Sequence, residues 1–381
     1  MDRVVYLIRR AEGGMSQHLI DLIKGLDRTR FEPVVIAPPG HKMSDELSRI
    51  DTPIYEADFP GRPNPIKVTR AVCRLARLFK KLKPDIIHIH GHMAAMVGIP
   101  AQRLAARRTP VVVSVHNYPS YQEARGFKRA FGTTVQRFLT RRASYLIAVS
   151  EDIRLNMVNE EGVNPATIIT VHNGIDLTDL PKTPTQAAIA EVKKIHEIET
   201  DDKVVGAIGR LVAFKGFSVL LEAAALLKDK RRRFKVIIVG RGPEENNLKK
   251  QRVELGIKDV VIIPGFVPDI SPYFAAADVF VVPSIREPFG LIVLQAMAAG
   301  RPVIGANAGG IPEIIRDGTT GVLVPPNDAS ALADAIDGLL DDTNRRRRLA
   351  TAALQDLKER FSIAMMVAKT QEIYERCLKG E

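Results

Sequence analysis

The chain has 381 residues, 45% of them hydrophobic, and a formal net charge of +11. This length fits roughly two domains of about 150 residues, and the composition excludes a disordered chain. The N-terminus has an acid at Asp2 and too short an apolar run for a signal peptide, and the sequence has no uninterrupted apolar stretch of about 18 residues, so we expect a cytoplasmic protein without a spanning helix. Cys73 and Cys377 are far apart and lack CxxC spacing, so we expect neither a disulfide framework nor a zinc site.

Ten short runs rich in Val and Ile alternate with helical patterns along the chain. Strands of this kind, buried on both faces and separated by helices, form the parallel sheets of doubly wound α/β folds. The polar stretch 177–200, which contains two prolines, separates five runs from the other five. We therefore predict two Rossmann-like domains, residues 1–178 and 201–360, joined by a linker at 179–200. Ligands of such sheets bind beyond the carboxyl ends of the strands, so we expect a functional cleft between the domains.

The predicted strands cover 4–8, 33–37, 85–90, 110–115 and 145–150 in the first domain, and 204–209, 235–240, 260–265, 279–284 and 302–306 in the second. Residues 361–381 are predicted to form a helix that packs back on the first domain. In the first strand-to-helix loop, Gly13 and Gly14 would let the backbone approach a ligand closely, although a Gly-Gly pair also suits an ordinary tight turn.

The predicted helix at 66–83 separates apolar from basic residues. No Asp or Glu occurs in residues 60–84, and an ordinary solvated helix face accounts poorly for that absence. A peripheral contact with an anionic membrane therefore stays open, since each basic residue near anionic lipid contributes about 1 kcal/mol. The apolar face holds Val68, Val72, Leu75, Phe79 and Leu82, and the opposite face holds Arg70, Arg74, Arg77 and Lys81.

The sequence "HIHGH" places His88, His90 and His92 at alternate positions near the end of a predicted strand. Three histidines on one strand face could hold a metal ion. No cluster of carboxylates or cysteines accompanies them in the sequence, so we expect no metal here.

In the second domain, two strand ends carry features that suit a phosphate group. The loop "GRLVAFKG" places Arg210 and Lys215 together, and "VGRGPEE" places Gly240 and Gly242 at a turn. That turn lacks the third glycine of a dinucleotide fingerprint, and the sequence has no GxxxxGK[ST] loop, which disfavours a nicotinamide-dependent dehydrogenase and a P-loop enzyme. By themselves, Arg210 and Lys215 could equally be solvated loop charges.

A further helix is predicted to begin just after Glu287 and to end at Gly300. The free amides of its first turn, at Phe289, Gly290 and Leu291, form an anion site. The helix is apolar except for Gln295.

Taken in order, these motifs resemble the retaining glycosyltransferases of family 4, which have the GT-B fold of two Rossmann-like domains. The resemblance extends over nearly the whole chain, and ordered motifs over such a span are specific. That family binds a nucleotide sugar mainly on its second domain and an acceptor on its first, and uses no metal or other cofactor. The segments are "GGMSQHLIDL", "DIIHIHG", "VVSVH", "IAVSE", "VHNGID", "GRLVAFKG", "VGRGPE", "PGFV" and "PSIREPFGLIVLQAMAAGRPVIGANAGGIPEII".

The resemblance also implies roles for individual residues. Arg210 and Lys215 would neutralise the diphosphate and the charge that grows on it as the glycosidic bond breaks. Glu287 would accept hydrogen bonds from the donor sugar, and His116 would lie near the reacting centre. The donor would further contact Gly14, Gly240, Val267, Phe289, Gly290, Leu291 and Gln295.

The sequence departs from the family at one position. The family's acid-x7-acid pattern has a second glutamate that binds the nucleotide ribose, and Gln295 stands in its place. An amide can accept from one ribose hydroxyl and donate to another, but without charge assistance.

We therefore predict a metal-independent glycosyltransferase that uses a nucleotide-sugar donor and a glycan or lipid-linked acceptor, as in polysaccharide biosynthesis. Because of Gln295, a nucleotide-sugar-binding protein without transfer activity is the main alternative. The net positive charge would also suit a nucleic-acid-binding protein, but the sequence shows neither interleaved aromatic residues nor a nucleic-acid-binding motif, so we expect no nucleic-acid partner.

Overall fold

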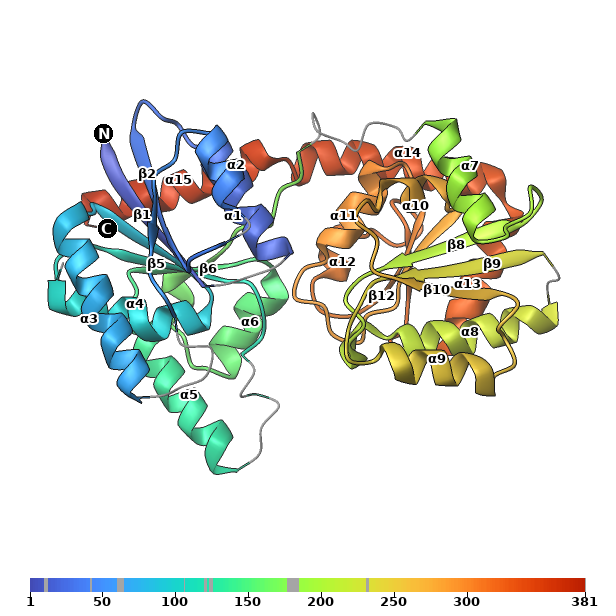
Figure 1. The fold of residues 1–381 in the computed structure, drawn as a ribbon, viewed down its shortest axis with the longest axis horizontal. Helices are drawn as coiled ribbons and strands as arrows, with labels where there is room; N and C mark the ends of the chain where they lie inside the picture. Colours follow the sequence, from blue (N-terminus) through green and yellow to red (C-terminus); the bar gives the residue numbers. More distant parts are fainter. Residues whose placement is uncertain are drawn as a thin grey trace. The chain divides into compact units, whose positions relative to one another are not determined.

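The computed structural model describes residues 1–9, 13–41, 43–59, 65–105, 107–119, 122, 126–176, 185–230 and 233–380. The chain forms two compact units: unit 1 comprises Met1–Gly174 and Ile363–Glu381, and unit 2 comprises Ile175–Ser362. Each unit is an α/β layer structure built on one parallel sheet (Figure 1).

Unit 1 has a seven-stranded sheet in the order β3-β2-β1-β4-β5-β6-β7. Its strands are β1 (Asp2–Ile8), β2 (Phe31–Ala37), β3 (Ile54–Glu56), β4 (Ile86–His90), β5 (Val111–Val115), β6 (Tyr145–Ala148) and β7 (Ile168–Thr170). Its helices are α1 (Gly14–Gly25), α2 (Ser44–Arg49), α3 (Pro65–Leu82), α4 (His92–Ala105), α5 (Phe127–Thr140), α6 (Glu151–Asn159) and α15 (Ile363–Lys379).

Unit 2 has a six-stranded sheet in the order β10-β9-β8-β11-β12-β13. Its strands are β8 (Lys203–Ile208), β9 (Phe234–Val239), β10 (Val261–Gly265), β11 (Val279–Val282), β12 (Val303–Ala306) and β13 (Val322–Val324). Its helices are α7 (Gln186–Ile195), α8 (Phe217–Lys230), α9 (Glu245–Glu254), α10 (Ser271–Ala276), α11 (Leu291–Ala298), α12 (Ile311–Ile314), α13 (Ala329–Asp341) and α14 (Thr343–Arg360).

The predicted fold class is confirmed, and all ten predicted strands are present. The sequence did not reveal β3, β7 and β13, each three residues long and each at the edge of its sheet. Three residues are too few for a run or an alternation to stand out from the surrounding sequence.

The predicted linker differs from the structure in part. Residues 186–195 form α7, which packs against α10 in unit 2, and Val192 lies in a small core with Val204 and Ile237. Within the predicted linker, α7 therefore packs as part of unit 2. Its two prolines lie outside the described residues.

In unit 1 the C-terminal helix α15 shares a core with the first strand and first helix (Figure 1). A polar chain crosses this core. The Tyr374 hydroxyl lies 2.6 Å from His88 Nδ1 and donates to the Tyr6 hydroxyl at 3.2 Å, while His88 Nε2 lies 2.8 Å from Ser114 Oγ. Buried polar groups need such partners, so this chain ties α15 to β1, β4 and β5.

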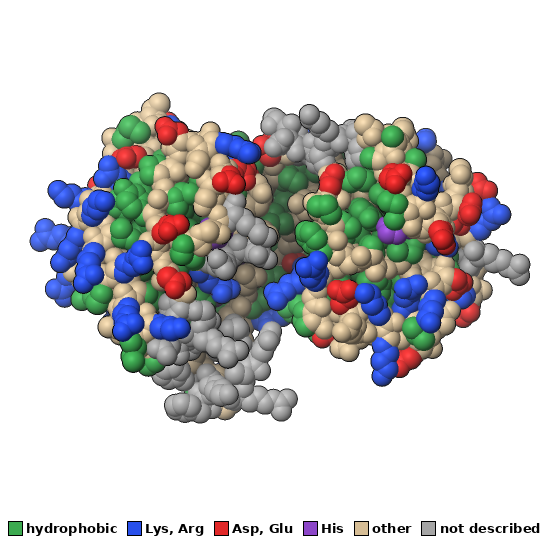
Figure 2. Space-filling model, in the orientation of Figure 1, with side chains coloured by type: hydrophobic (Ala, Val, Ile, Leu, Met, Phe, Trp, Pro, Cys, Tyr) green, Lys and Arg blue, Asp and Glu red, His purple; other side chains and the backbone are tan. Residues whose placement is uncertain are grey.

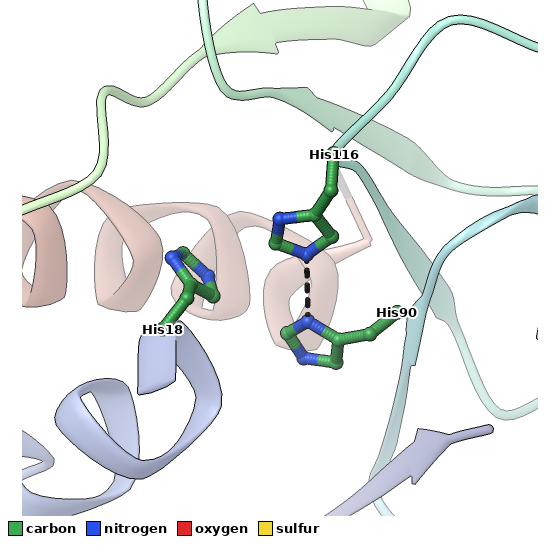
Figure 3. Close-up of side chains that lie close together, drawn as sticks. All are labelled: His18, His90 and His116. Atoms are coloured by element: carbon green, nitrogen blue, oxygen red, sulfur yellow. Dashed lines mark hydrogen bonds between the residues drawn. The ribbon is translucent and has the colours of Figure 1, made fainter. Parts of the chain in front are cut away.

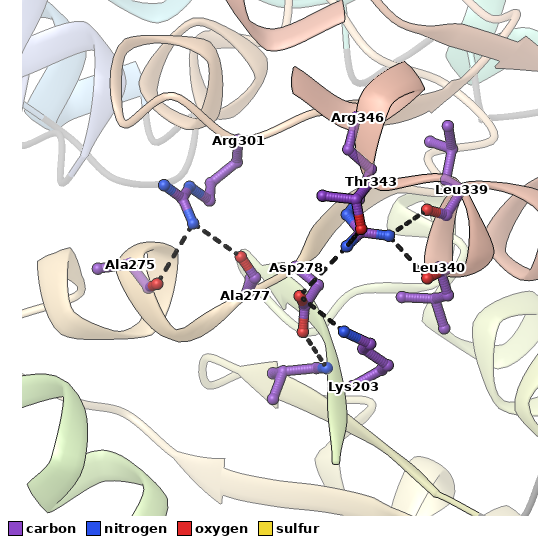
Figure 4. Close-up of polar contacts among 10 residues, drawn as sticks. Lys203, Ala275, Ala277, Asp278, Arg301, Leu339, Leu340, Thr343 and Arg346 are labelled. Carbon is purple, nitrogen blue, oxygen red and sulfur yellow. Dashed lines mark hydrogen bonds and ion pairs between the residues drawn. The ribbon is translucent and has the colours of Figure 1, made fainter. Parts of the chain in front are cut away.

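Two arginines of unit 2 donate hydrogen bonds to backbone carbonyls at helix ends (Figure 4). Arg346 is buried and donates through Nη1 to the carbonyls of Leu339 and Leu340 at the end of α13, at 2.6 and 2.7 Å. Arg301 donates to the carbonyls of Ala275, in the last turn of α10, and of Ala277, just after that helix, at 3.4 and 3.1 Å. Both side chains therefore satisfy carbonyls that helix ends leave without intrahelical partners.

Candidate functional site

The predicted phosphate-binding residues of unit 2 lie in loops at the carboxyl edge of its sheet. Arg210 and Lys215 both follow β8, and Lys215 ends a short 3₁₀ turn at Ala213–Lys215. The next residue, Gly216, has φ +68°, and a Cβ there would meet the Pro283 carbonyl oxygen at 1.9 Å. Glycine is required at this position, because it lets the loop after β8 lie directly against the chain that leaves β11.

This close approach brings Lys215 to Glu287. The Lys215 ammonium lies 2.5 Å from Glu287 Oε2, and the same oxygen accepts a hydrogen bond from Ser284 Oγ at 2.9 Å. The Glu287 side chain is 7% exposed and the Lys215 side chain 20%. A carboxylate this deeply buried needs a cation or hydrogen-bond donors to offset its desolvation, and Lys215 and Ser284 supply both.

Glu287 is also fixed through its backbone. Its carbonyl oxygen accepts a hydrogen bond from the Gly310 amide at 2.9 Å, and a Cβ on Gly310 would meet the Phe289 Cα at 2.7 Å. The loop before α11 therefore rests on the Gly310 backbone, which places the carboxylate at the start of that helix.

The start of α11 has the geometry of an anion site. Gly290, the residue before the helix, has φ +113°, and the helix runs from Leu291 to Ala298. Amides in the first turn of a helix have no intrahelical acceptor, and they carry the positive end of the helix dipole. The Phe289 side chain is buried against the Phe361 ring, at 6.1 Å between centroids, so only its backbone remains for a ligand.

Two further predicted contacts follow β9 and β10. Gly240 has φ +149°, and a Cβ there would meet the Gly209 carbonyl oxygen at 1.8 Å, so the loops after β8 and β9 also touch through a glycine. Val267 is half-buried and packs against the small core that includes Val239.

Gln295 is half-buried on α11, between the buried Leu294 and Ala296.

In unit 1, the structure places Gly14 and His116 in separate elements. Gly14 is the first residue of α1, and His116 follows β5 directly. Burial lowers the pKa of His116 well below its usual range, and the neighbouring His18 acts in the same direction. His116 is therefore a neutral imidazole at pH 7.

His116 belongs to a cluster of three buried histidines that the sequence did not reveal. His90 Nδ1 lies 3.1 Å from His116 Nε2, and the His18 ring lies 4.8 Å from the His116 ring between centroids (Figure 3). Burial also lowers the pKa of His18, to about 4, while the neighbouring Asn173 acts in the opposite direction. We call His18, His90 and His116 the histidine cluster.

The grouping of His88, His90 and His92 is not the one the structure forms. His88 is engaged with Tyr374 and Ser114, and His92 begins α4 with its Nε2 3.2 Å from the Asn117 carbonyl oxygen. In the histidine cluster their place is taken by His18, which lies on α1, far earlier in the chain. Membership of His18 in the cluster could be predicted only by knowing that the fold places α1 beside the ends of β4 and β5.

The helix α3 has the predicted division of faces. Val72, Leu75, Phe79 and Leu82 are buried and Val68 is half-buried, whereas Arg70, Arg74, Arg77 and Lys81 are exposed. Arg74 donates to the Glu56 carbonyl at 3.0 Å, and Lys81 lies over the Tyr55 ring. Arg70, Arg77 and Lys80 make no ion pair among the described residues. Within the same residues, no helix has both the length and the apolar composition to span a membrane.

The two halves of the chain match two family models. Residues 12–179 match the model described as Glycosyltransferase Family 4, and residues 188–356 match Glycosyl transferases group 1. The chain is 31% identical over 364 residues to a D-inositol 3-phosphate glycosyltransferase of Corynebacterium aurimucosum, with 91% of this chain and 81% of that protein covered. It is 26% identical over 378 residues to an uncharacterized glycosyltransferase of Methanocaldococcus jannaschii, with 96% and 95% covered.

Solved structures agree with the fold. HepE of Anabaena, crystallised in complex with UDP, has a TM-score of 0.83 at 24% identity, with 98% of this chain and 100% of that chain covered. Its likeness extends over both parallel-sheet units. Sequence and fold together show that this chain belongs to the family 4-type glycosyltransferases with the GT-B fold.

Proposed function

We propose that this glycosyltransferase moves a sugar from a nucleoside diphosphate sugar to an acceptor, with retention of configuration and without a metal ion. The observation that carries the proposal is the Lys215–Glu287 pair at the start of α11. It puts a cation, a carboxylate and the first-turn amides of α11 at one edge of the sheet. Those groups suit, respectively, the phosphates, the sugar hydroxyls and the developing negative charge.

Lys215 and Glu287 satisfy each other's charge in the structure, and a bound donor would offer each a matched partner. Lys215, with the exposed Arg210, would turn to the diphosphate, and Glu287 would accept hydrogen bonds from the sugar. The bond between the anomeric carbon and the phosphate oxygen breaks, and a bond to the acceptor oxygen forms. The acceptor proton passes to the leaving phosphate, so no pair of flanking carboxylates is needed. The roles predicted for Gly14 and His116 stay predictions.

The donor class is supported by the relatives, since HepE has been crystallised with UDP and with UDP-glucose. Binding at 100 times the Kd should stabilise this chain by roughly 2.7 kcal/mol, which thermal-shift measurements with a panel of nucleotide sugars would detect. Arg210→Ala and Lys215→Ala should each weaken NDP binding, whereas Lys250→Ala, a matched change at an exposed lysine of α9, should leave it unchanged.

Transfer itself is tested with the stabilising donor and a set of glycan and lipid-linked acceptors. We expect product with the donor's anomeric configuration, and equal rates with and without EDTA. A chain that binds the donor with no product from any acceptor, and no donor hydrolysis, would instead be a nucleotide-sugar-binding protein. Unchanged NDP affinity in both Arg210→Ala and Lys215→Ala would refute the phosphate assignment.

Gln295 should bind the nucleotide ribose. It lies one turn into α11, which begins at Leu291, and its side chain is half-buried. Gln295→Ala should weaken NDP binding by about 0.5–1.5 kcal/mol, as for a neutral hydrogen bond, and Gln295→Glu should bind at least as well as the natural chain. Calorimetric titration with NDP measures both, and an unchanged Kd in Gln295→Ala would show that the amide is not a ribose ligand.

We further propose that α3 docks the protein on an anionic membrane surface, where lipid-linked acceptors would be met. Its basic face is exposed, and Figure 2 shows Lys and Arg side chains gathered over the part of unit 1 where α3 lies. Ile66, one turn before Arg70, is 65% exposed. An exposed apolar residue beside exposed basic residues suits the boundary between headgroups and acyl chains.

Changing Arg70, Arg77 and Lys80 to Gln should reduce cosedimentation with vesicles that contain anionic lipid. These three are chosen because Arg74 and Lys81 also contact unit 1. The matched control changes Arg345, Arg347 and Arg348 on α14, which removes the same charge from unit 2. Pelleting should also weaken with added salt. Equal loss in the two triple variants would show that net charge alone governs binding.

A further inference from the structure

We propose that the histidine cluster is a binding site for a single transition-metal ion of the Zn²⁺, Co²⁺ or Ni²⁺ kind, distinct from the groups that hold the sugar donor in unit 2. His18, His90 and His116 each offer one ring nitrogen, and these three atoms lie within 4.8 Å of one another. The three side chains come from α1, the end of β4 and the residue after β5, and Figure 3 shows the His90 and His116 rings directed at each other.

The spacing is close to that of a metal site. A tetrahedral ion with bonds of 2.0–2.1 Å places its ligand nitrogens about 3.4 Å apart. The His90 and His116 nitrogens are already 3.1 Å apart, so the pair needs almost no adjustment. His18 would have to approach by about an ångström, a change that side-chain rotation on α1 can supply. Three ligands leave a fourth position for water, as in open zinc sites.

A second observation supports a ligand at this place. His18 Nδ1 and His90 Nε2 are both buried, and neither finds a hydrogen-bond partner within the described parts of the chain. A buried nitrogen without a partner costs roughly 1–3 kcal/mol, and native proteins carry few of them. An ion held by His90 Nδ1 and His116 Nε2 would give the unpartnered His18 Nδ1 a partner, whereas His90 Nε2, on the other side of its ring, would take no part.

The donor set also fixes the class of ion. Imidazole nitrogens suit Zn²⁺, Ni²⁺ and Cu²⁺, whereas Mg²⁺ and Ca²⁺ prefer oxygen ligands. No carboxylate takes part in the cluster within the described residues. The site therefore differs from the magnesium sites that bind nucleotide phosphates.

The test uses the full chain with Cys73→Ser, because the exposed Cys73 thiol could bind metal by itself. Metal-free protein is titrated with Co²⁺ and followed by visible absorption. We expect one equivalent to give the strong absorption of tetrahedral cobalt, and Zn²⁺ to displace it. Zn²⁺ at 100 times its Kd should also raise the melting temperature by roughly 5 °C or more.

His90→Ala and His18→Ala should each weaken binding by more than the 10- to 100-fold typical of losing an outer-shell partner. His196→Ala, a change at a half-buried histidine of unit 2, is the matched control and should bind cobalt normally. Circular dichroism verifies that each variant is folded.

Absence of a saturable cobalt band in the parent chain would overturn the proposal, whatever the variants do. An unchanged band in folded His90→Ala and His18→Ala would overturn it too, because the metal would then lie elsewhere. Neither readout involves a sugar substrate, so the result is independent of the proposed function.

Discussion

Glu287→Ala should slow sugar transfer by about 10- to 150-fold, which corresponds to the 1.5–3 kcal/mol of a hydrogen bond to a charged group. The loss is expected in the transfer step, because the carboxylate is assigned to the sugar and not to the nucleotide. Free NDP should bind at least as tightly as before. The reason is the ion pair: without Glu287, the Lys215 ammonium loses its 2.5 Å partner and is free for the diphosphate.

Two further variants make this result specific. Glu287→Gln keeps an acceptor for Ser284 Oγ but removes the charge, so it separates the carboxylate's effect on the sugar from simple loss of packing. Glu245→Ala removes an acid of the same unit that pairs with Lys249, one turn along α9, and should leave transfer unchanged. Steady-state transfer rates and calorimetric titration with NDP are measured on the natural chain, Glu287→Ala, Glu287→Gln and Glu245→Ala. Transfer at the natural rate in Glu287→Ala would refute the sugar-binding role.

Arg346→Met should lower the free energy of unfolding of unit 2 by about 3 kcal/mol or more. Hydrogen bonds from a charged donor contribute about 1.5–3 kcal/mol, and Arg346 makes several from a buried position. Besides the two carbonyls at the end of α13, its Nη2 donates to Thr343 Oγ1 at 2.9 Å and lies 3.8 Å from Asp278 Oδ1 (Figure 4). Methionine fills much of the volume but leaves these acceptors without their donor.

The next residue on the same helix supplies the control. Arg347 is exposed, so Arg347→Met should change stability by no more than about 0.5 kcal/mol. Urea unfolding followed by circular dichroism gives both values, with unequal m-values marking any change in the unfolded ensemble. Equal midpoints for Arg346→Met and Arg347→Met would show that the buried guanidinium is dispensable.

The sequence by itself determined the fold class and the family. Continuous Val/Ile runs between helical patterns imply strands that are covered on both faces. Each run can be recognised by itself, without knowing which strand it will pair with. The sequence also predicted a helix that begins just after Glu287, whereas α11 begins at Leu291, because Gly290 before it has a positive φ that is not helical. Loops that follow neighbouring parallel strands share one edge, so Arg210, Lys215 and Glu287 could be assigned to one site.

The tertiary structure decided the contacts between distant segments. The Lys215–Glu287 pair spans 72 residues and depends on Gly216 lying against the Pro283 carbonyl, which no periodicity encodes. The histidine cluster joins α1 to the ends of β4 and β5, and an isolated His18 in an amphipathic helix reads as an ordinary side chain. In the same way, the many polar residues of α7 made this stretch look like a linker in the sequence. Its buried side becomes visible only from its packing against α10. Local patterns specify elements, but long-range packing selects which polar groups meet and share their hydrogen bonds.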